Sequence, residues 1–486
     1  MVNASNGLRY QAAGGVRWTG LATGINAGFS FVQTAVLAHL LSPSDFGVGS
    51  MVAVVVAFTQ LFSDAGVSSA LIYRQQPTSQ ELSSLYWFNI MMGAAMFAVI
   101  NVAVALAVWF FDEPRLAGPL RLASAVFLIV PLGQQFQFLL QKELRFRPLA
   151  TISMSGYLAG AIVAVTFAAS GAGVYALVLG QLANSLVRTA LLLRGRWEMR
   201  PRLHFSHRDL RGYVGFGLYQ TGDRAANFFN AYLLHGLIGS MLGARALGIY
   251  TLAFELAFKP LDAITPIVTR VAFPVFASIR DDLDRVRRGY LSMLRLLSTV
   301  NFPLALGIGA AAPVIIPAVY GEAWRPAIPL VQVLSIVALL RSTGSPVGAL
   351  LLGLGKPNWG FRWSVSVAFL QLPVLYAGIA VNEAYGAASA YLVLQLIFTA
   401  AAYLLLVRNL IGPCLGDYLR AMLPSLGLAL GVAAVVHSAA TALHDMPAMS
   451  QLAVLVVLAP LAYLGFAMVF ARPLVVELLQ IVRSRK

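Results

Sequence analysis

Charged side chains inside long apolar segments are the residues in this sequence most able to do chemistry. A charge near the centre of a bilayer costs about 2.5–3.5 kcal/mol on insertion scales, so each one needs a partner, a water-filled cavity or a function. Arginine can bond two oxygens of an anion at once, and a carboxylate can carry a proton or pair with a cation. The six residues concerned are Asp223, Arg224, Glu255, Lys259, Asp262 and Arg341.

The elements that must position these charges are membrane-spanning helices. Of the 486 residues, 59% are hydrophobic and only 11% are charged, whereas a soluble chain needs about a quarter charged. Apolar runs long enough to cross about 30 Å of hydrocarbon recur from end to end. We expect an all-α polytopic membrane protein with about 14 transmembrane helices. The expected spans are approximately 17–41, 46–73, 83–111, 116–140, 148–170, 172–193, 213–240, 246–272, 289–311, 326–353, 360–381, 384–407, 418–440 and 450–471.

The distribution of basic residues predicts the orientation. With a cytoplasmic N-terminus, about 27 Lys and Arg fall on or near inner loops and about four on outer loops, which is the asymmetry of the positive-inside rule. Both termini are then cytoplasmic. We expect the basic residues behind the formal net charge of +15 to interact with anionic lipid head groups rather than with nucleic acid. The inner segment 278–289 is expected to form a short amphipathic helix at the membrane surface.

Three weak matches in order indicate an internal repeat. The turn before Gly47 matches the turn before Gly248 at an offset of 201, and later matches follow at offsets of 212 and 214. Six spans per repeat make the two copies parallel, an arrangement typical of transporters with a central cavity. The expected domains are a six-helix lobe over 1–194, a basic cytoplasmic linker over 195–212, a second six-helix lobe over 213–410, and two extra helices with a basic tail over 411–486.

Helix geometry places three cations at middle depth. At 1.5 Å per residue, Arg224 lies about 16 Å from the cytoplasmic end of its span, Lys259 about 18–20 Å and Arg341 about 22 Å from the outer ends of theirs. Glu255, Lys259 and Asp262 share one helix face. For Glu255 and Lys259, mutual neutralisation and a role in a cavity stay equally open. Arg341 has no acidic neighbour within a turn, which favours a cavity.

Five stretches of the sequence carry a family resemblance: Leu41-Ser-Pro-Ser-Asp-Phe-Gly47, Phe62-Ser-Asp-Ala-Gly-Val-Ser-Ser-Ala-Leu-Ile72, Leu237-Ile-Gly-Ser-Met-Leu-Gly-Ala-Arg-Ala-Leu-Gly-Ile-Tyr250, Tyr320-Gly-Glu-Ala-Trp324 and Leu351-Leu-Gly-Leu-Gly-Lys-Pro357. They resemble the corresponding stretches of Wzx-type polysaccharide flippases of the multidrug/oligosaccharidyl-lipid/polysaccharide exporter superfamily. The resemblance covers roughly residues 10–410 and implies that fold, together with movement of undecaprenyl-diphosphate-linked sugars to the periplasmic leaflet of the bacterial inner membrane.

If the resemblance holds, the cations Arg224, Lys259 and Arg341 would hold the diphosphate and acidic sugars of a lipid-linked oligosaccharide. The carboxylates Asp223, Glu255 and Asp262 would serve ion coupling or ion pairing. The expected partners are this lipid-linked oligosaccharide and membrane lipids, with a polysaccharide polymerase and export machinery as further candidates. Four glutamines of the fourth span are expected to bond between helices, with sugar contact as the alternative. Gln134, Gln137 and Gln141 share a face, and Gln135 does not.

Catalysis is not expected. The sequence has no Walker loop, no metal-ligand spacing of Cys and His, and no nucleophile beside a base, so we expect no enzyme, no cofactor and no metal site. Two rival functions remain. An ion-coupled multidrug or cation antiporter of the same superfamily would need an acidic cavity, whereas the mid-membrane excess here is basic. A membrane glycosyltransferase or polymerase would need a long outer loop with acidic catalytic groups, and the outer loops are short.

Overall fold

The computed structural model describes residues 24–63, 78–195 and 201–470, without the side chains of 211–224, 226–227, 266–274 and 470. Within these ranges the chain consists of helices and turns and contains no strand. Ten helical segments of the described residues are long and apolar enough to cross a membrane. The all-α polytopic class is therefore confirmed, and the total of about 14 spans stays a prediction.

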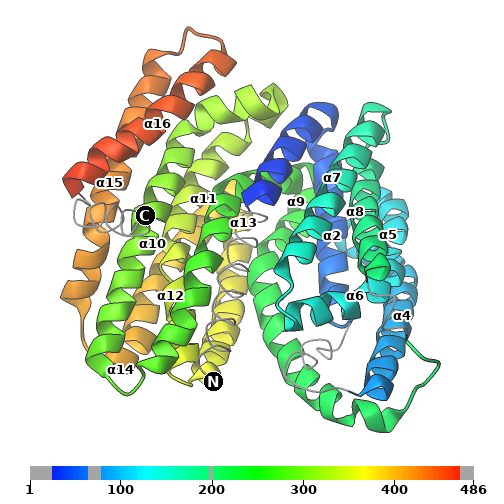
Figure 1. Ribbon diagram of the computed structural model, residues 1–486. Coiled ribbons are helices and arrows are strands. Elements are labelled where there is room, and N and C mark those ends of the chain that lie inside the picture. Colours follow the sequence, from blue (N-terminus) through cyan, green and yellow to red (C-terminus); the bar gives the residue numbers. More distant parts are fainter. Residues whose placement is uncertain (1–23, 64–77, 196–200, 471–486) are drawn as a thin grey trace. The chain divides into compact units, whose positions relative to one another are not determined.

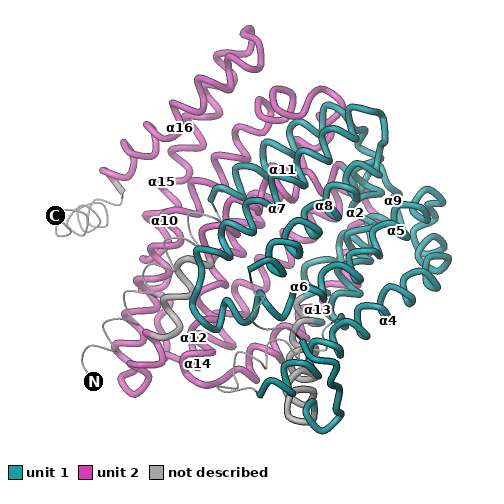
Figure 2. The backbone as a smooth tube through the Cα atoms, turned by 45° about the vertical axis from the view of Figure 1, so that its right-hand side comes forward, with its two compact units in different colours: residues 1–248 teal, residues 249–486 magenta. Residues whose placement is uncertain are grey.

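The chain divides into two compact units, residues 1–248 and 249–486 (Figure 2). In the first unit α7 packs along α8, α8 against α6, and α4 against α5 and α6 (Figure 1). Its helices are a helix over 24–40, α2 (Pro43–Gln60), α4 (Ser79–Phe111), η1 (Pro114–Leu116), α5 (Ala117–Ser124), α6 (Val126–Lys142), α7 (Phe146–Ala169), α8 (Val174–Arg194) and the first part of α9 (His207–Ser278).

The second unit is built around α10, which packs against α11 and along α15, with α16 on α15. Its elements after α9 are α10 (Leu283–Ile315), η2 (Ile316–Tyr320), η3 (Glu322–Trp324), α11 (Ala327–Ser342), α12 (Ser345–Gly353), α13 (Pro357–Ala402), η4 (Tyr403–Val407), α14 (Arg408–Ile411), α15 (Leu415–Ala442) and α16 (Ala448–Phe470). The expected domain ranges, with a linker over 195–212, stay predictions.

Two long helices are interrupted where the sequence predicted outer turns. Helix α9 breaks at Gly243, whose φ of 79° is a left-handed conformation that glycine adopts without steric cost. Helix α13 breaks at Asn382 and Glu383. In contrast, the expected surface helix over 278–289 is not separate. Helix α10 begins at Leu283, where the Asp282 side chain accepts a hydrogen bond from the Arg285 backbone N–H, and continues without interruption to Ile315. This N-cap starts a helix, and nothing ends it before the membrane segment.

The two glycine turns matched by the repeat lie against each other within the first unit. A Cβ atom placed on Gly47 would lie 1.7 Å from the Ala244 carbonyl oxygen, and one placed on Gly248 would lie 1.8 Å from the Pro43 carbonyl oxygen. The contact is reciprocal, because each glycine approaches the residue four positions before the other. Only glycine permits backbones to approach this closely.

The second half of the basic linker is attached to the start of α4. The Ser84 hydroxyl donates to Asp209 Oδ2 at 2.6 Å and accepts from the Ser206 backbone N–H at 3.0 Å. His204 Nε2 lies 3.0 Å from the same Asp209 oxygen. The hydrogen bond from Ser84, together with the bond and charge of His204, lowers the pKa of Asp209. These contacts connect two segments far apart in sequence, so the linker is part of the first unit's packing.

Candidate functional site

The second part of α9 carries the predicted row of charges on one face. Lys259 Nζ lies 2.7 Å from Glu255 Oε2, and the two side chains are 47% and 37% exposed. Asp262 follows one turn later and is also exposed. The ion pair between Glu255 and Lys259, one of the two alternatives for these residues, is therefore present in the structure. An exposed pair contributes only about 0–1 kcal/mol in water, so pairing alone is a weak reason for placing these charges inside a membrane helix.

Arg341, on helix α11, lies close to this row of charges on α9. Its guanidinium carbon lies 5.3 Å from the centre of the Phe258 ring, a cation–π distance. It is also close enough to Asp262 to interact electrostatically with it, but it forms no ion pair within 4.0 Å among the described residues. The structure thus brings together Glu255, Lys259, Asp262 and Arg341, which we call the charged face of the second unit.

The position of Arg341 depends on a helix break that the sequence did not predict. The single span expected over 326–353 is two helices, because α11 ends at Ser342 and α12 begins at Ser345. Arg341 lies in the last turn of α11. The carbonyl groups at a helix C-terminus carry partial negative charge and favour a cation there. This helix end therefore supports an exposed guanidinium at mid-span without a neutralising carboxylate.

The remaining two predicted site residues are Asp223 and Arg224, both in the first part of α9. Their side chains lie outside the described residues, so their predicted roles stay predictions.

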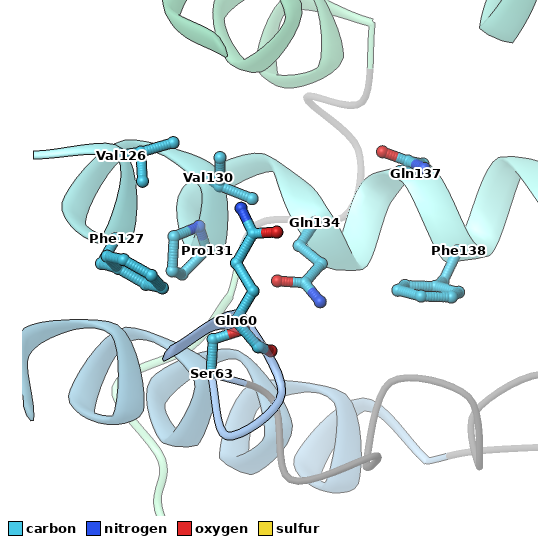
Figure 3. A pocket seen from close by; sticks show the side chains of 9 residues that line it. All are labelled: Gln60, Ser63, Val126, Phe127, Val130, Pro131, Gln134, Gln137 and Phe138. Carbon is cyan, nitrogen blue, oxygen red and sulfur yellow. The ribbon is translucent and has the colours of Figure 1, made fainter. Parts of the chain in front are cut away.

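A second candidate feature is a polar cavity of about 290 Å³ in the first unit, which we call the amide cavity. In Figure 3 the side chains of Gln60 and Gln134 point toward each other across it. The rest of the lining is Ser63, Val126, Phe127, Val130, Pro131, Gln137 and Phe138. Three amides and a hydroxyl beside two phenyl rings can bond and stack against an uncharged polar molecule such as a sugar.

The glutamines of α6 divide between two roles. Gln134 and Gln137 line the amide cavity, whereas Gln135 is 8% exposed and donates to the Leu82 carbonyl oxygen at 2.9 Å. The sequence predicted that Gln135 would face away from the other two. The sequence did not predict the contribution of Gln60, the last residue of α2, or of Ser63 just after it. No spacing within that segment connects them to a helix more than sixty residues later.

The fold defines the class of protein. The lipid II flippase MurJ, in an inward closed conformation, matches with a TM-score of 0.76 at 14% identity, over 94% of this chain and 99% of that chain. An inward-facing multidrug resistance MATE family transporter of the MOP superfamily matches with a TM-score of 0.60 at 13% identity, over 79% of this chain and 94% of that chain. At these identities the likeness is one of fold. The chain is a multi-pass membrane protein with the fold of this superfamily.

Sequence comparison then defines the family. Residues 36–329 match the model of a polysaccharide biosynthesis protein family. The teichuronic acid biosynthesis protein TuaB of Bacillus subtilis (strain 168) is 34% identical over 95% of this chain and 96% of its own length. The lipopolysaccharide biosynthesis protein WzxC of Escherichia coli (strain K12) is 33% identical over 85% of each chain. The chain belongs to this polysaccharide biosynthesis protein family.

Proposed function

We propose that this protein moves an undecaprenyl-diphosphate-linked oligosaccharide from the cytoplasmic to the periplasmic leaflet of the bacterial inner membrane. The glycan would be a repeat unit of an exopolysaccharide, O-antigen or capsule. Membership of a polysaccharide biosynthesis family supports the substrate class. The similarity in fold to a lipid II flippase supports this mode of action.

The observation that carries the proposed mechanism is Arg341, an exposed arginine in a membrane-spanning segment with no ion pair among the described residues. Facing hydrocarbon, such a group would cost a few kcal/mol. A water-filled cavity removes that cost, and a diphosphate in the cavity would supply the missing anion. Lys259, 47% exposed, would add a second cation beside it. Arg224 would be the third cation, and the carboxylates Asp223, Glu255 and Asp262 would pair with cations or carry the coupling ion.

Transport would proceed by alternating access. Two six-helix lobes, 1–194 and 213–410, would rock about the cavity, with both termini and the linker 195–212 in the cytoplasm. The polar head would travel through the cavity while the isoprenoid tail stays in lipid along α15 and α16. Only 11% of the most apolar stretch of α16 is buried, which suits a helix that faces lipid chains. The amide cavity would contact the sugars. Polysaccharide polymerase and export proteins would receive the product.

Reconstitution tests the function directly. Proteoliposomes would carry lipid-linked oligosaccharide extracted from a strain that lacks this protein, and an impermeant reagent would report the sugars on the outer surface. We expect the protein to equilibrate the sugars between leaflets at a rate well above that of empty vesicles. Proton- or sodium-driven uptake of a cationic dye without sugar movement would instead indicate the antiporter. Lengthening of the glycan by the purified protein would indicate a polymerase.

Charge reversal separates pairing from substrate binding at Glu255 and Lys259. Each single reversal, Glu255→Lys or Lys259→Glu, places like charges one turn apart, and we expect it to lower both protein level and export. The double reversal restores the pair, so we expect protein level to recover. Export should stay low, because the cation that binds the diphosphate of the substrate would then stand at position 255 instead of 259. Recovery of export along with protein level would mean that the pair is purely structural.

A further inference from the structure

The second unit has a second cationic site, which shares no residue with the charged face. Helices α10 and α15 lie side by side (Figure 1) and leave a cleft of about 500 Å³ where both helices begin. We call it the arginine cleft. Its lining consists of Asp284, Arg287, Arg288, Leu291, Arg295, Asp417 and Arg420. The five residues from α10 follow a helical spacing that places them on one face.

The charges of the arginine cleft do not cancel. Arg287 is held by Asp417, with Nη2 2.7 Å from Oδ2, and Arg420 lies 4.0 Å from the other oxygen of Asp417. Arg288 and Arg295 form no ion pair within 4.0 Å among the described residues. Four guanidiniums therefore face two carboxylates, and the excess is positive. The Arg287–Asp417 pair connects α10 and α15 at the arginine cleft, beside Arg288 and Arg295.

The length of α10 places the cleft at the edge of the membrane. Its 33 residues extend about 50 Å, whereas the hydrocarbon core is about 30 Å thick, so its first turns emerge at head-group level. Further along α10 and α15 the two helices are in contact, where the hydroxyl oxygens of Thr299 and Ser425 lie 3.0 Å apart in a buried position. Exposed leucines run along α15 from the same level at intervals of four residues: Leu415, Leu419 and Leu423 are 53%, 46% and 57% exposed.

We propose that the arginine cleft binds the phosphate of a lipid head group, with the lipid chains against the leucines of α15. Guanidinium forks match phosphate oxygens, and basic pockets between transmembrane helices recognise anionic lipid head groups. The apolar row on the same helix as Asp417 and Arg420 favours an amphipathic ligand over free phosphate. The phosphate has two sources, a bilayer phospholipid or the polyprenyl carrier. The arginines of the cleft are not those of the charged face, so binding of a phosphate here does not depend on the proposed transport function.

Native mass spectrometry of the full-length protein tests this site. The probes are phosphatidylglycerol and undecaprenyl diphosphate, with diacylglycerol as the phosphate-free control. The test variant is Arg288→Gln with Arg295→Gln, which spares Arg287 because its loss would leave Asp417 unpaired. Arg362→Gln, which removes an exposed arginine of α13, is the matched control. We expect the double variant to bind at least one phosphate-bearing lipid about tenfold more weakly, the equivalent of one charge-assisted hydrogen bond.

The outcomes separate the two sources of phosphate. Arginine-dependent binding of phosphatidylglycerol would make the cleft a phospholipid site, and arginine-dependent binding of undecaprenyl diphosphate would make it a carrier site. Equal melting temperatures for the three proteins would exclude misfolding. The proposal is overturned if neither lipid's affinity changes in the double variant, or if Arg362→Gln weakens binding as much. Lipid binding is measured without transport, so failure of the reconstituted transport assay would not change the result of this test.

Discussion

Replacing Arg341 by alanine is expected to reduce polysaccharide export by a factor of about ten to one hundred while leaving a folded, inserted protein. A hydrogen bond to a charged group contributes about 1.5–3 kcal/mol, which corresponds to this range in affinity. Folding should survive because Arg341 is exposed and lacks an ion pair among the described residues, so its removal leaves no buried charge unpaired. Surface glycan measured against the amount of membrane-inserted protein is the readout.

The matched control is Arg325→Ala. Arg325 precedes the same helix, α11, is exposed, and pairs with Glu322 outside the charged face. We expect normal export from this variant. Arg341→Lys separates charge from shape, since lysine keeps the charge but cannot bond two oxygens as a fork, and we expect intermediate export. Normal glycan output from Arg341→Ala would exclude Arg341 from the proposed substrate site and leave it the structural contacts with Phe258 and Asp262.

Replacing Gly248 by alanine is expected to destabilise the protein by about 1–3 kcal/mol or more, the usual cost of overpacking. The added Cβ would lie 1.8 Å from the Pro43 carbonyl oxygen and 2.9 Å from the Gly47 nitrogen. Both are backbone atoms, so no side-chain rotation can relieve the overlap and the helices must separate. The measurement is thermal unfolding of the detergent-solubilised protein, monitored by the size of its size-exclusion chromatography peak after heating. We expect a lower melting temperature than that of the unaltered protein.

Gly236→Ala, in the part of α9 before the break at Gly243, is the control, because a Cβ there meets nothing within 4 Å. Alanine has a higher helix propensity than glycine by about 1 kcal/mol, so this substitution should leave the melting temperature unchanged or raise it. Both variants replace glycine by alanine, so they add the same methyl group at different places. We expect Gly248→Ala to lower the melting temperature and Gly236→Ala to leave it unchanged or raise it. Equal melting temperatures for Gly248→Ala and the unaltered protein would show that the contact between the two glycine turns can open without cost.

Much of the local structure was predictable because it depends on neighbours in the chain. The scarcity of charge predicted membrane-spanning helices, and turn residues predicted the breaks at Gly243 and at Asn382–Glu383. Helical periodicity predicted the shared face of Glu255, Lys259 and Asp262 and the opposite orientation of Gln135. The break after Arg341 was not predicted, because the apolar residues over 326–353 are enough for one span, although Gly344 and Pro346 are signals of a turn and a helix start.

The sequence by itself determined that this is a helical membrane protein, which of its helix faces are polar, and which glycines belong to matched turns. These properties follow from composition, from the periodicity of a helix and from the internal sequence repeat. Only the tertiary structure decided which faces meet. It places Arg341 over Phe258, Gln60 opposite Gln134, and Arg287 against Asp417, 130 residues away. Such pairs depend on how separate helices pack, and periodicity within one helix carries no information about its neighbour.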